Sequence, residues 1–313
     1  MSNLRVIFMG TPDFAVPCLD MLVTKQYNVV AVVSQPDRPK GRGQKLAQSP
    51  VKQAALAYGL TVLQPNKVKD AEFQIELSLL KPDLIIVVAF GQLLPKAILD
   101  LPPLGCINVH ASLLPSYRGA APIHWAVING EQVTGVTTMY MDVGMDTGDM
   151  ILKDEVGITE YETTGMIHDK LKESGAKILS ETIQLIVANK APRTVQNHES
   201  ATYASMLNRD VEAIDWQKPA NDIHNLVRGL NPWPGAYCSF QDKNLKTWQT
   251  RVYEREASIS KPGTIVKITT EGFVVETGQG MLEVLEVQPA SKRRMSAKDF
   301  VYGYGVGVGD ILG

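Results

Sequence analysis

Cysteine is scarce in this sequence, and the three that occur, Cys18, Cys106 and Cys238, lie far apart. An odd, widely spaced set excludes a disulfide framework, and no C-x-x-C pair offers a zinc site. Neither H-E-x-x-H nor a P-loop is present, so a metalloprotease or a phosphoryl-transfer enzyme has no support. We expect three small, buried, apolar cysteines, a reducing compartment and no metal ion.

Long hydrophobic runs are also missing. The longest, LIIVVAF at 84–90, has the length of a strand and cannot cross a membrane. The apolar stretch in MSNLRVIFMG is too short for a signal peptide, and it is not rich in Arg and Ser as a transit peptide is. We expect a soluble, cytoplasmic protein with no membrane partner.

Neither sign of charge prevails, because 31 Lys and Arg stand against 33 Asp and Glu, for a formal net charge of −2. This balance excludes a uniformly basic surface for nucleic acid, but it leaves room for a local basic patch. The glycine fingerprint of dinucleotide binding is missing too, since MGTPDFAV supplies only Gly10 after the first apolar run. A nicotinamide-dependent oxidoreductase is therefore poorly supported.

Short apolar runs alternate with helical patterns through the first half of the chain. The expected elements are helices at 14–22, 50–59 and 122–130, and strands at 5–10, 28–35, 83–91 and 106–111. Pro122 and Gly130 fit the start and the stop of the last helix. This order predicts a Rossmann-like α/β domain whose mostly parallel sheet is covered on both faces. In such sheets ligands bind at the carboxyl ends of the strands.

The second half changes character. Two strands within 135–156 flank a Gly/Asp loop, and a long amphipathic helix is expected at 163–190. Residues 191–205 are polar and irregular, which favours a linker. A helix near 219–230 and several short β-rich runs then predict a small, OB-like β-barrel. We expect a catalytic domain at 1–190, a linker at 191–205 and a C-terminal barrel domain at 206–313.

The stretch CINVHA (106–111) places an amide and an imidazole where a buried strand ends. Asn108 and His110 are two positions apart, so their side chains share one face of the strand. A carbonyl under nucleophilic attack develops negative charge on oxygen, and preorganised donors stabilise that charge. Asn donates without changing charge, and His donates or moves a proton near neutral pH. The pair favours acyl-type transfer, although N-x-H alone is a common pattern.

The Gly-rich loop MDVGMDTGDM (141–150) carries three acidic residues and leaves three interpretations open. Its spacing does not fit an EF-hand, so a cation site has little support. Such loops are more often plain turns with Asx hydrogen bonds. If one of the carboxylates reached His110, it could orient the imidazole as the third member of a triad does.

The stretch QPDRPKGRGQKLAQSP (35–50) is a long basic loop inside the expected α/β pattern. It sets four cations against the single Asp37: Arg38, Lys40, Arg42 and Lys45. Unstructured loops of this length are uncommon and are often functional. A solvated surface excursion and a flexible arm for a polyanion fit the composition equally well.

Two longer stretches resemble a known family. INVHASLLPSYRGAAPIHWAVINGE (107–131) and TGVTTMYMDVGMDTGDM (134–150) are similar to the signature of the folate-dependent formyltransferases. Further matches at ATYASML, IDW and LNPWPGAY, within 201–237, resemble the second domain of those members that act on methionyl-tRNA. The resemblance implies formyl transfer from 10-formyltetrahydrofolate to the α-amine of methionyl initiator tRNA by a monomeric enzyme of translation initiation.

The resemblance also implies roles for individual residues. The catalytic residues would be Asn108, His110 and Asp146. Folate would contact Ser112, Leu113, Leu114 and Pro115, together with Phe90, Gly91 and Gln92 of a loop at 89–95 that lines the pterin pocket. The tRNA acceptor stem would contact Arg38, Lys40, Arg42 and Lys45, with Arg42 foremost. Ser116 departs from the family pattern, in which Lys or Arg is common at this position.

Two alternatives remain, one within the same class of enzyme and one from another class of protein. A formyltransferase for a nucleotide-linked amino sugar or a purine precursor would share the three catalytic residues but not this second domain. A catalytically silent RNA-binding protein would not need them. The basic residues Lys292, Arg293, Arg294 and Lys298 fit either a continued RNA track or an ordinary solvated face.

Overall fold

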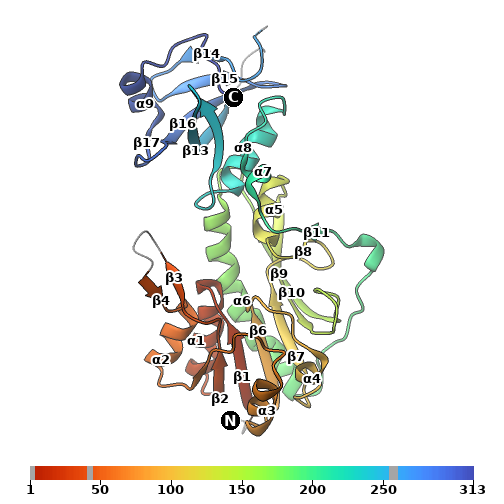
Figure 1. Cartoon of the computed structure of the whole chain (residues 1–313). Coiled ribbons are helices and arrows are strands. Elements are labelled where there is room, and N and C mark those ends of the chain that lie inside the picture. Colours follow the sequence, from red (N-terminus) through yellow and green to blue (C-terminus); the bar gives the residue numbers. More distant parts are fainter. Residues whose placement is uncertain (1–3, 41–44, 254–259) are drawn as a thin grey trace. The chain divides into compact units, whose positions relative to one another are not determined.

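The computed structural model describes residues 4–40, 45–253 and 260–313, and the chain forms two compact units (Figure 1). Unit 1 comprises Met1–Pro122, Val133–Gly157 and His168–Ala204, and unit 2 comprises Ile123–Gln132, Ile158–Ile167 and Ser205–Gly313. The predicted boundaries at 190 and 205 stay a prediction.

Unit 1 is built on a seven-stranded sheet in the order β10-β9-β7-β6-β1-β2-β5. The strands are β1 (Arg5–Gly10), β2 (Asn28–Val33), β5 (Val62–Leu63), β6 (Leu84–Val88), β7 (Cys106–His110), β9 (Val133–Tyr140) and β10 (Met150–Gly157). The strands from β5 to β7 are parallel, whereas β9 and β10 run antiparallel to their neighbours. The predicted Rossmann-like, mostly parallel sheet is confirmed.

Up to the end of α6, the helices among the described residues are η1 (Asp13–Ala15), α1 (Val16–Thr24), α2 (Pro50–Ala57), α3 (Ala71–Leu79), α4 (Lys96–Leu99), α5 (Pro122–Ile128) and α6 (Thr164–Val187). Within unit 1, α6 packs closely on the sheet at Gly175, where a Cβ would lie 3.2 Å from Val109 of β7. At Gly130 φ is +71°, the left-handed conformation that ends helices, as expected after α5.

Several short elements of unit 1 were not expected. The basic loop contains an antiparallel hairpin of β3 (Arg38–Lys40) and β4 (Lys45–Ala47), so the expectation of a loop without structure was wrong for these residues. Strand β8 (Arg118–Gly119) pairs in parallel with β11 (Tyr203–Ala204), and η2 (His198–Ser200) lies just before β11. Strands of two or three residues are too short to show a periodic pattern in the sequence. The pairing of β8 with β11 also depends on a segment far along the chain, which no local pattern reports.

Unit 2 contains an antiparallel sheet in the order β12-β13-β16-β15-β14, with β17 pairing with β16. The elements are α7 (Arg209–Glu212), α8 (Ala220–Gly229), β12 (Ala236–Phe240), β13 (Lys243–Tyr253), β14 (Ile265–Ile268), β15 (Phe273–Glu276), β16 (Met281–Pro289), β17 (Met295–Ser296) and α9 (Ala297–Tyr304). The last residues bond to both edge strands: Asp310 O accepts from Ile265 N of β14, and Gly313 N donates to Ser239 O of β12. Residues 310–313 therefore bond to both edge strands of the sheet, β12 and β14, and a barrel requires its edge strands to be linked in this way.

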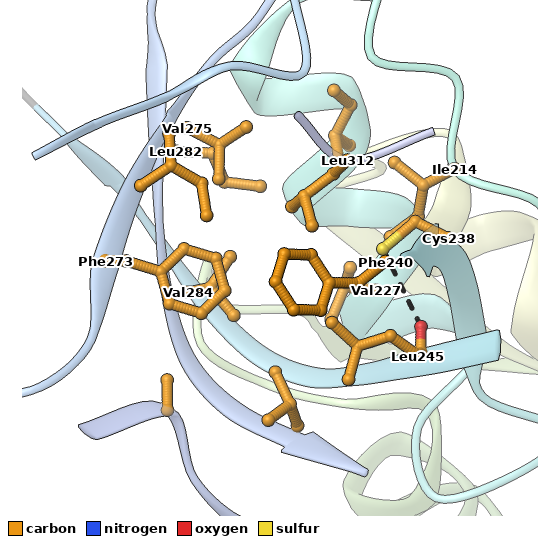
Figure 2. Close-up of a cluster of buried hydrophobic side chains, with 14 of the residues drawn as sticks. Ile214, Val227, Cys238, Phe240, Leu245, Phe273, Val275, Leu282, Val284 and Leu312 are labelled. Carbon is orange, nitrogen blue, oxygen red and sulfur yellow. Dashed lines mark hydrogen bonds between the residues drawn. The ribbon is translucent and has the colours of Figure 1, made fainter. Parts of the chain in front are cut away.

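The core of unit 2 lies between this sheet and its helices (Figure 2). Val227 of α8 and Phe300 of α9 are almost fully buried, and the Phe300 ring meets that of Phe240 edge-on, with 5.5 Å between centroids. Cys238 lies in the same core, and its thiol donates to Leu245 O. Aromatic pairs in this geometry add to the stabilisation from burial.

The three cysteines are free and buried, as expected. Burial raises the pKa of the Cys106 and Cys238 thiols to about 12 and raises that of Cys18 still further. Within the described residues, no helix is both long and apolar enough to cross a membrane. Over the same part of the chain, no group of three or more His, Cys, Asp and Glu side chains is placed to hold a metal ion.

Candidate active site

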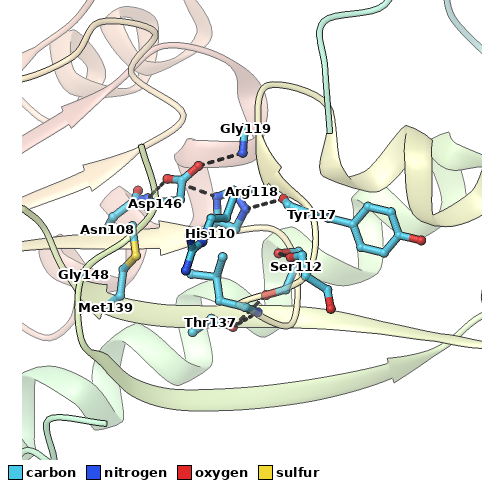
Figure 3. Close-up of polar contacts among 12 residues, drawn as sticks. Asn108, His110, Ser112, Tyr117, Arg118, Gly119, Thr137, Met139, Asp146 and Gly148 are labelled. Carbon is cyan, nitrogen blue, oxygen red and sulfur yellow. Dashed lines mark hydrogen bonds and ion pairs between the residues drawn. The ribbon is translucent and has the colours of Figure 1, made fainter. Parts of the chain in front are cut away.

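The carboxyl end of β7 carries the first two residues of the site. Asn108 pairs with Met139 of β9 and His110 with Thr137, so the two side chains lie on the same side of the sheet, as expected (Figure 3). Only 9% of Asn108 and 6% of His110 is exposed. A buried strand thus holds both side chains rigidly at the edge where ligands bind to such sheets.

Asp146 completes the cluster from the loop between β9 and β10. Its Oδ1 lies 3.4 Å from Asn108 Nδ2 and 3.6 Å from His110 Nδ1, and its Oδ2 accepts a hydrogen bond of 2.8 Å from Gly119 N. The sequence left three interpretations of this loop open, and the structure brings one of its carboxylates to the imidazole. The three predicted catalytic residues therefore form one contact cluster.

The hydrogen bonds of His110 define how its ring faces Asp146. Nε2 lies 3.0 Å from Tyr117 O, and because a carbonyl only accepts, Nε2 carries a hydrogen there. Nδ1 then faces the carboxylate, and it can donate only when the ring is protonated. Asp146 thus lies against Nδ1, the ring nitrogen that the carboxylate of a triad also faces.

The loop after β7 is held by internal hydrogen bonds. Thr137 Oγ1 donates to Ser112 O at 2.7 Å and accepts from Leu114 N at 3.1 Å, and Ser112 Oγ donates to Ser116 O at 2.6 Å. Ser112 and Leu114 are fully buried, whereas Leu113 and Pro115 are partly exposed. Of the four predicted folate contacts in this loop, only Leu113 and Pro115 thus present side chains for a ligand.

The second predicted folate segment lies after β6. Phe90 is buried, and its carbonyl accepts from Thr11 Oγ1 at 3.0 Å and from Gln35 Nε2 at 3.3 Å. The Gln92 side chain bonds to the backbone of Val68 and Asn66, so it braces a neighbouring loop.

Phe90 and Gly91 line a cleft of about 440 Å³, where Arg38 and Pro39 of the hairpin also lie. Asn108, His110 and Asp146 are not among its lining residues. A predicted folate segment and a predicted RNA contact therefore share a cleft at the ends of β1, β2 and β6.

The structure describes part of the basic loop. Arg38 is exposed, the side chains of Lys40 and Lys45 are not described, and Arg42 lies outside the described residues. Asp37 bonds to Lys52 Nζ and Gln64 Nε2, both at 2.8 Å, and these contacts lower the pKa of its carboxyl. The one acidic residue of the loop is thus neutralised by α2.

Two residues beside the cluster were missed in the sequence. Arg118 and Gln196 have only 1% and 2% of their surface exposed, and they bond to each other. Arg118 stands between polar and small residues in SYRGAA, and Gln196 lies in the polar stretch that the sequence predicts to be a linker. Neither position carries a local pattern that could have marked it.

Comparisons with known proteins agree with this geometry. The family profile described as "Formyl transferase" matches residues 3–183, and "Formyl transferase, C-terminal domain" matches residues 206–305. A protein of Acetivibrio thermocellus named methionyl-tRNA formyltransferase is 52% identical over 310 residues, which cover 99% of this chain and 100% of that protein. The chain belongs to the methionyl-tRNA formyltransferase family. It is therefore a formyl-transfer enzyme.

Other relatives and solved structures extend the comparison. A family member from Desulforamulus reducens is 53% identical, with 99% of this chain and 98% of that protein covered. An N-formyltransferase from Helicobacter canadensis, solved with folinic acid and dTDP-3-aminofucose, has a TM-score of 0.69 at 20% identity and covers 90% of this chain and 99% of its own. HypX from Aquifex aeolicus, solved with tetrahydrofolic acid, has a TM-score of 0.66 at 16% identity, covering 98% of this chain and 48% of its own. The two structures share the fold.

Proposed function

We propose that the chain transfers the formyl group of 10-formyltetrahydrofolate to the α-amine of methionyl initiator tRNA, acting as a cytoplasmic monomer. The observation that carries the proposal is the Asn108–His110–Asp146 cluster at the end of β7. Relatives that bear the methionyl-tRNA formyltransferase name match nearly the whole chain at 52–53% identity. The N-formyltransferase solved with dTDP-3-aminofucose also covers 90% of the chain, so the second domain does not exclude an amino-sugar enzyme, but its 20% identity makes that alternative the weaker one.

The reaction forms a bond between the acceptor nitrogen and the formyl carbon and breaks the bond from that carbon to the donor nitrogen. The acceptor amine loses one proton, and the leaving nitrogen gains one. A free α-amine has a pKa of roughly 7.7–8, so a neutral nucleophile is available near neutral pH. The folate co-substrate supplies the formyl carbon, and the partly exposed Leu113 and Pro115 fit an apolar rim against which a flat pteridine ring can pack.

The cluster provides the groups that this reaction needs. Asn108 Nδ2 has two hydrogens, of which one points to Asp146 and the other serves the negative charge that develops on the formyl oxygen. We propose that His110 supplies the second donor for this charge through its Nε2–H, which must then turn away from Tyr117 O. Asp146 orients the imidazole and helps to receive the amine proton, either directly or through water.

Substitution of Asn108 tests the catalytic assignment. With charged initiator tRNA and 10-formyltetrahydrofolate, we expect Asn108→Ala to lower kcat on the order of 100- to 1000-fold while the folate Kd stays unchanged. Asn28→Ala is the matched control, because Asn28 is exposed at the start of β2. A wild-type protein that yields no formylmethionine would refute the proposed function, and normal turnover by Asn108→Ala would remove Asn108 from the mechanism.

We propose that the hairpin contacts RNA through its cations. Removing one phosphate contact weakens binding and reduces the slope of log K against log salt by about one unit. Arg38→Ala should therefore raise the KM for tRNA and flatten its salt dependence, whereas Lys69→Ala, which removes an exposed cation outside the hairpin, should do neither. An equal loss with a minimal methionyl ester as the acceptor would show that Arg38 does not act on RNA.

Unit 2 offers a second basic surface. Lys292, Arg293, Arg294 and Lys298 are exposed, and the Arg294 guanidinium stacks on Trp248 with 3.4 Å to the ring centroid. Arg beside an aromatic ring suits stacking and phosphate contacts with RNA. We propose that this face supports the RNA, and Arg294→Ala should then weaken tRNA binding without changing kcat for a methionyl ester.

A further inference from the structure

The segment that follows α6 contains a buried side chain that reaches the acidic loop of the site. Gln196 is 2% exposed, and its Nε2 donates to Asp146 O and to Gly148 O, both at 2.8 Å. These two carbonyls flank Thr147, so one amide bridges the turn that carries the carboxylate. A few residues earlier, Thr194 exchanges backbone hydrogen bonds with Met150, which anchors the segment beside the same loop.

Arg118 determines which way the Gln196 amide points. Its Nε and Nη2 donate to Gln196 Oε1 at 3.1 and 2.7 Å, and its Nη1 lies 3.2 Å from His198 Nδ1. A guanidinium only donates, so the amide oxygen must face Arg118 and the amide nitrogen must face the loop. A buried guanidinium needs such partners, because charge taken from water without hydrogen bonds costs much free energy.

The Asp146 backbone needs to be held in place. Its φ is +54°, a left-handed conformation that non-glycine residues adopt at some cost and keep only where their surroundings enforce it. Gly148 fits its place because a Cβ there would clash with Tyr140 O. Without the amide of Gln196, the turn would lose two hydrogen bonds, one at Gly148 and one at Asp146, whose carboxylate must reach His110.

The Asp146 carboxylate is tied to the same part of unit 1. Its Oδ2 accepts from Gly119 N, and Gly119 pairs with Ala204 in the β8–β11 bridge. Arg118 N in turn donates to Thr202 O at 2.9 Å. Both the backbone and the side chain of Asp146 are thus located by contacts with residues 118–119 and 196, and the β8–β11 bridge secures 118–119 in turn.

We propose that Gln196, oriented by Arg118, is a positioning residue that places the Asp146 carboxylate against His110. This inference rests on the proposed function of the Asn108–His110–Asp146 cluster. Gln196 bonds to Arg118 and to backbone carbonyls of the acidic loop, and not to the three catalytic side chains, so we expect its loss to affect turnover rather than substrate binding. Supporting residues of this kind change activity by about 10- to 100-fold when they are lost.

Two substitutions distinguish the contact of Gln196 with Arg118 from its contacts with the carbonyls of Asp146 and Gly148. Gln196→Met keeps the length of the side chain and removes all its hydrogen bonds. Gln196→Glu keeps an oxygen for Arg118 but turns a carboxylate oxygen toward the two carbonyls, so it should not restore activity. Val195→Ala is the control on the same segment, since Val195 is 74% exposed.

With full-length protein, checked for folding by circular dichroism, we expect Gln196→Met to lower kcat about 10- to 100-fold while the KM of each substrate changes by no more than about 2-fold. Gln196→Glu should lose at least as much, and Val195→Ala should match wild type. Because Gln196 acts through Asp146, Gln196→Met should have little further effect in the Asp146→Asn background.

Three results would overturn the proposal. These are normal kcat in Gln196→Met, recovery in Gln196→Glu, and losses that multiply in the double variant. A Gln196→Met protein that is less stable but has normal kcat per folded molecule would also overturn the proposal, because it would show a purely structural role. An inactive wild-type protein would instead refute the proposed function, so the two failures are distinct.

Discussion

The stability of unit 1 should depend on the absence of a side chain at Gly119. Its φ is +114°, which L-amino acids rarely adopt, and a Cβ there would lie 2.7 Å from Ala204 O. The obstacle is backbone, so relief requires β11 to move away from β8. That movement would strain the hydrogen bonds of Arg118 N and Ala120 N to Thr202 O and Ala204 O, each 2.9 Å long.

These contributions give the size of the effect for Gly119→Ala. The disallowed backbone conformation costs about 1–3 kcal/mol, and each weakened hydrogen bond costs about 1 kcal/mol. With two such hydrogen bonds, we therefore expect a loss of about 3–5 kcal/mol in the free energy of unfolding. Gly157→Ala is the matched control, since no atom lies within 4 Å of its added Cβ, and it should leave the stability within about 0.5 kcal/mol of wild type.

Urea unfolding measures this difference. Trp125, Trp216, Trp233 and Trp248 all belong to unit 2, so tryptophan fluorescence follows that unit while far-UV circular dichroism follows both. The Gly119→Ala transition should shift to lower urea in circular dichroism, with faster hydrogen exchange in peptides from 114–121 and 198–205. If Gly119→Ala unfolds at the same urea concentration as Gly157→Ala, the account of the β8–β11 bridge is wrong.

Two further predictions follow from the shifted pKa values of the cysteine thiols and of the Asp37 carboxyl. Because burial raises the pKa of Cys106 and Cys238 to about 12, and that of Cys18 further still, no thiol should react with Ellman's reagent within minutes at pH 8, and all three should react once the chain unfolds. Fast reaction of the folded protein would contradict the burial. Because the folded pKa of Asp37 is lowered by Lys52 and Gln64, its carboxylate stabilises the fold above about pH 4 and loses this effect as the pH falls through the lowered value. Asp37→Asn should thus lower the urea midpoint at pH 7 but not at pH 2, whereas Asp70→Asn, at an exposed N-cap without a side-chain bond, should change neither.

Much of unit 1 could be predicted from the sequence, because buried parallel strands are continuous apolar runs. The runs that became β1, β2, β6 and β7 are recognisable on that ground, and the period of two placed Asn108 and His110 on one face. Asp146 was harder to assign. Residues alone left its loop open among three interpretations, and only the family resemblance singled out one of three carboxylates.

Arg118 and Gln196 show what sequence reasoning could not reach. They are 78 positions apart, and their bond exists only because β8 and β11 bring distant segments together. Polar, irregular composition usually indicates solvent-exposed chain, and on that ground the stretch containing Gln196 is predicted to be a linker. Burial of its amide is a tertiary property, and no periodicity within the segment reports it.

Residues 191–204 belong to unit 1, and this bears on how chimeras between relatives should be assembled. A crossover placed at the end of α6 would pair the acidic loop of one parent with the Gln196 segment of the other, and any mismatch would fall on Asp146. A junction placed after Ala204 takes β11, the Gln196 segment and the acidic loop of Asp146 from the same parent. Exchange of the C-terminal halves should then alter acceptor preference while the rate of the chemical step is inherited from the N-terminal parent.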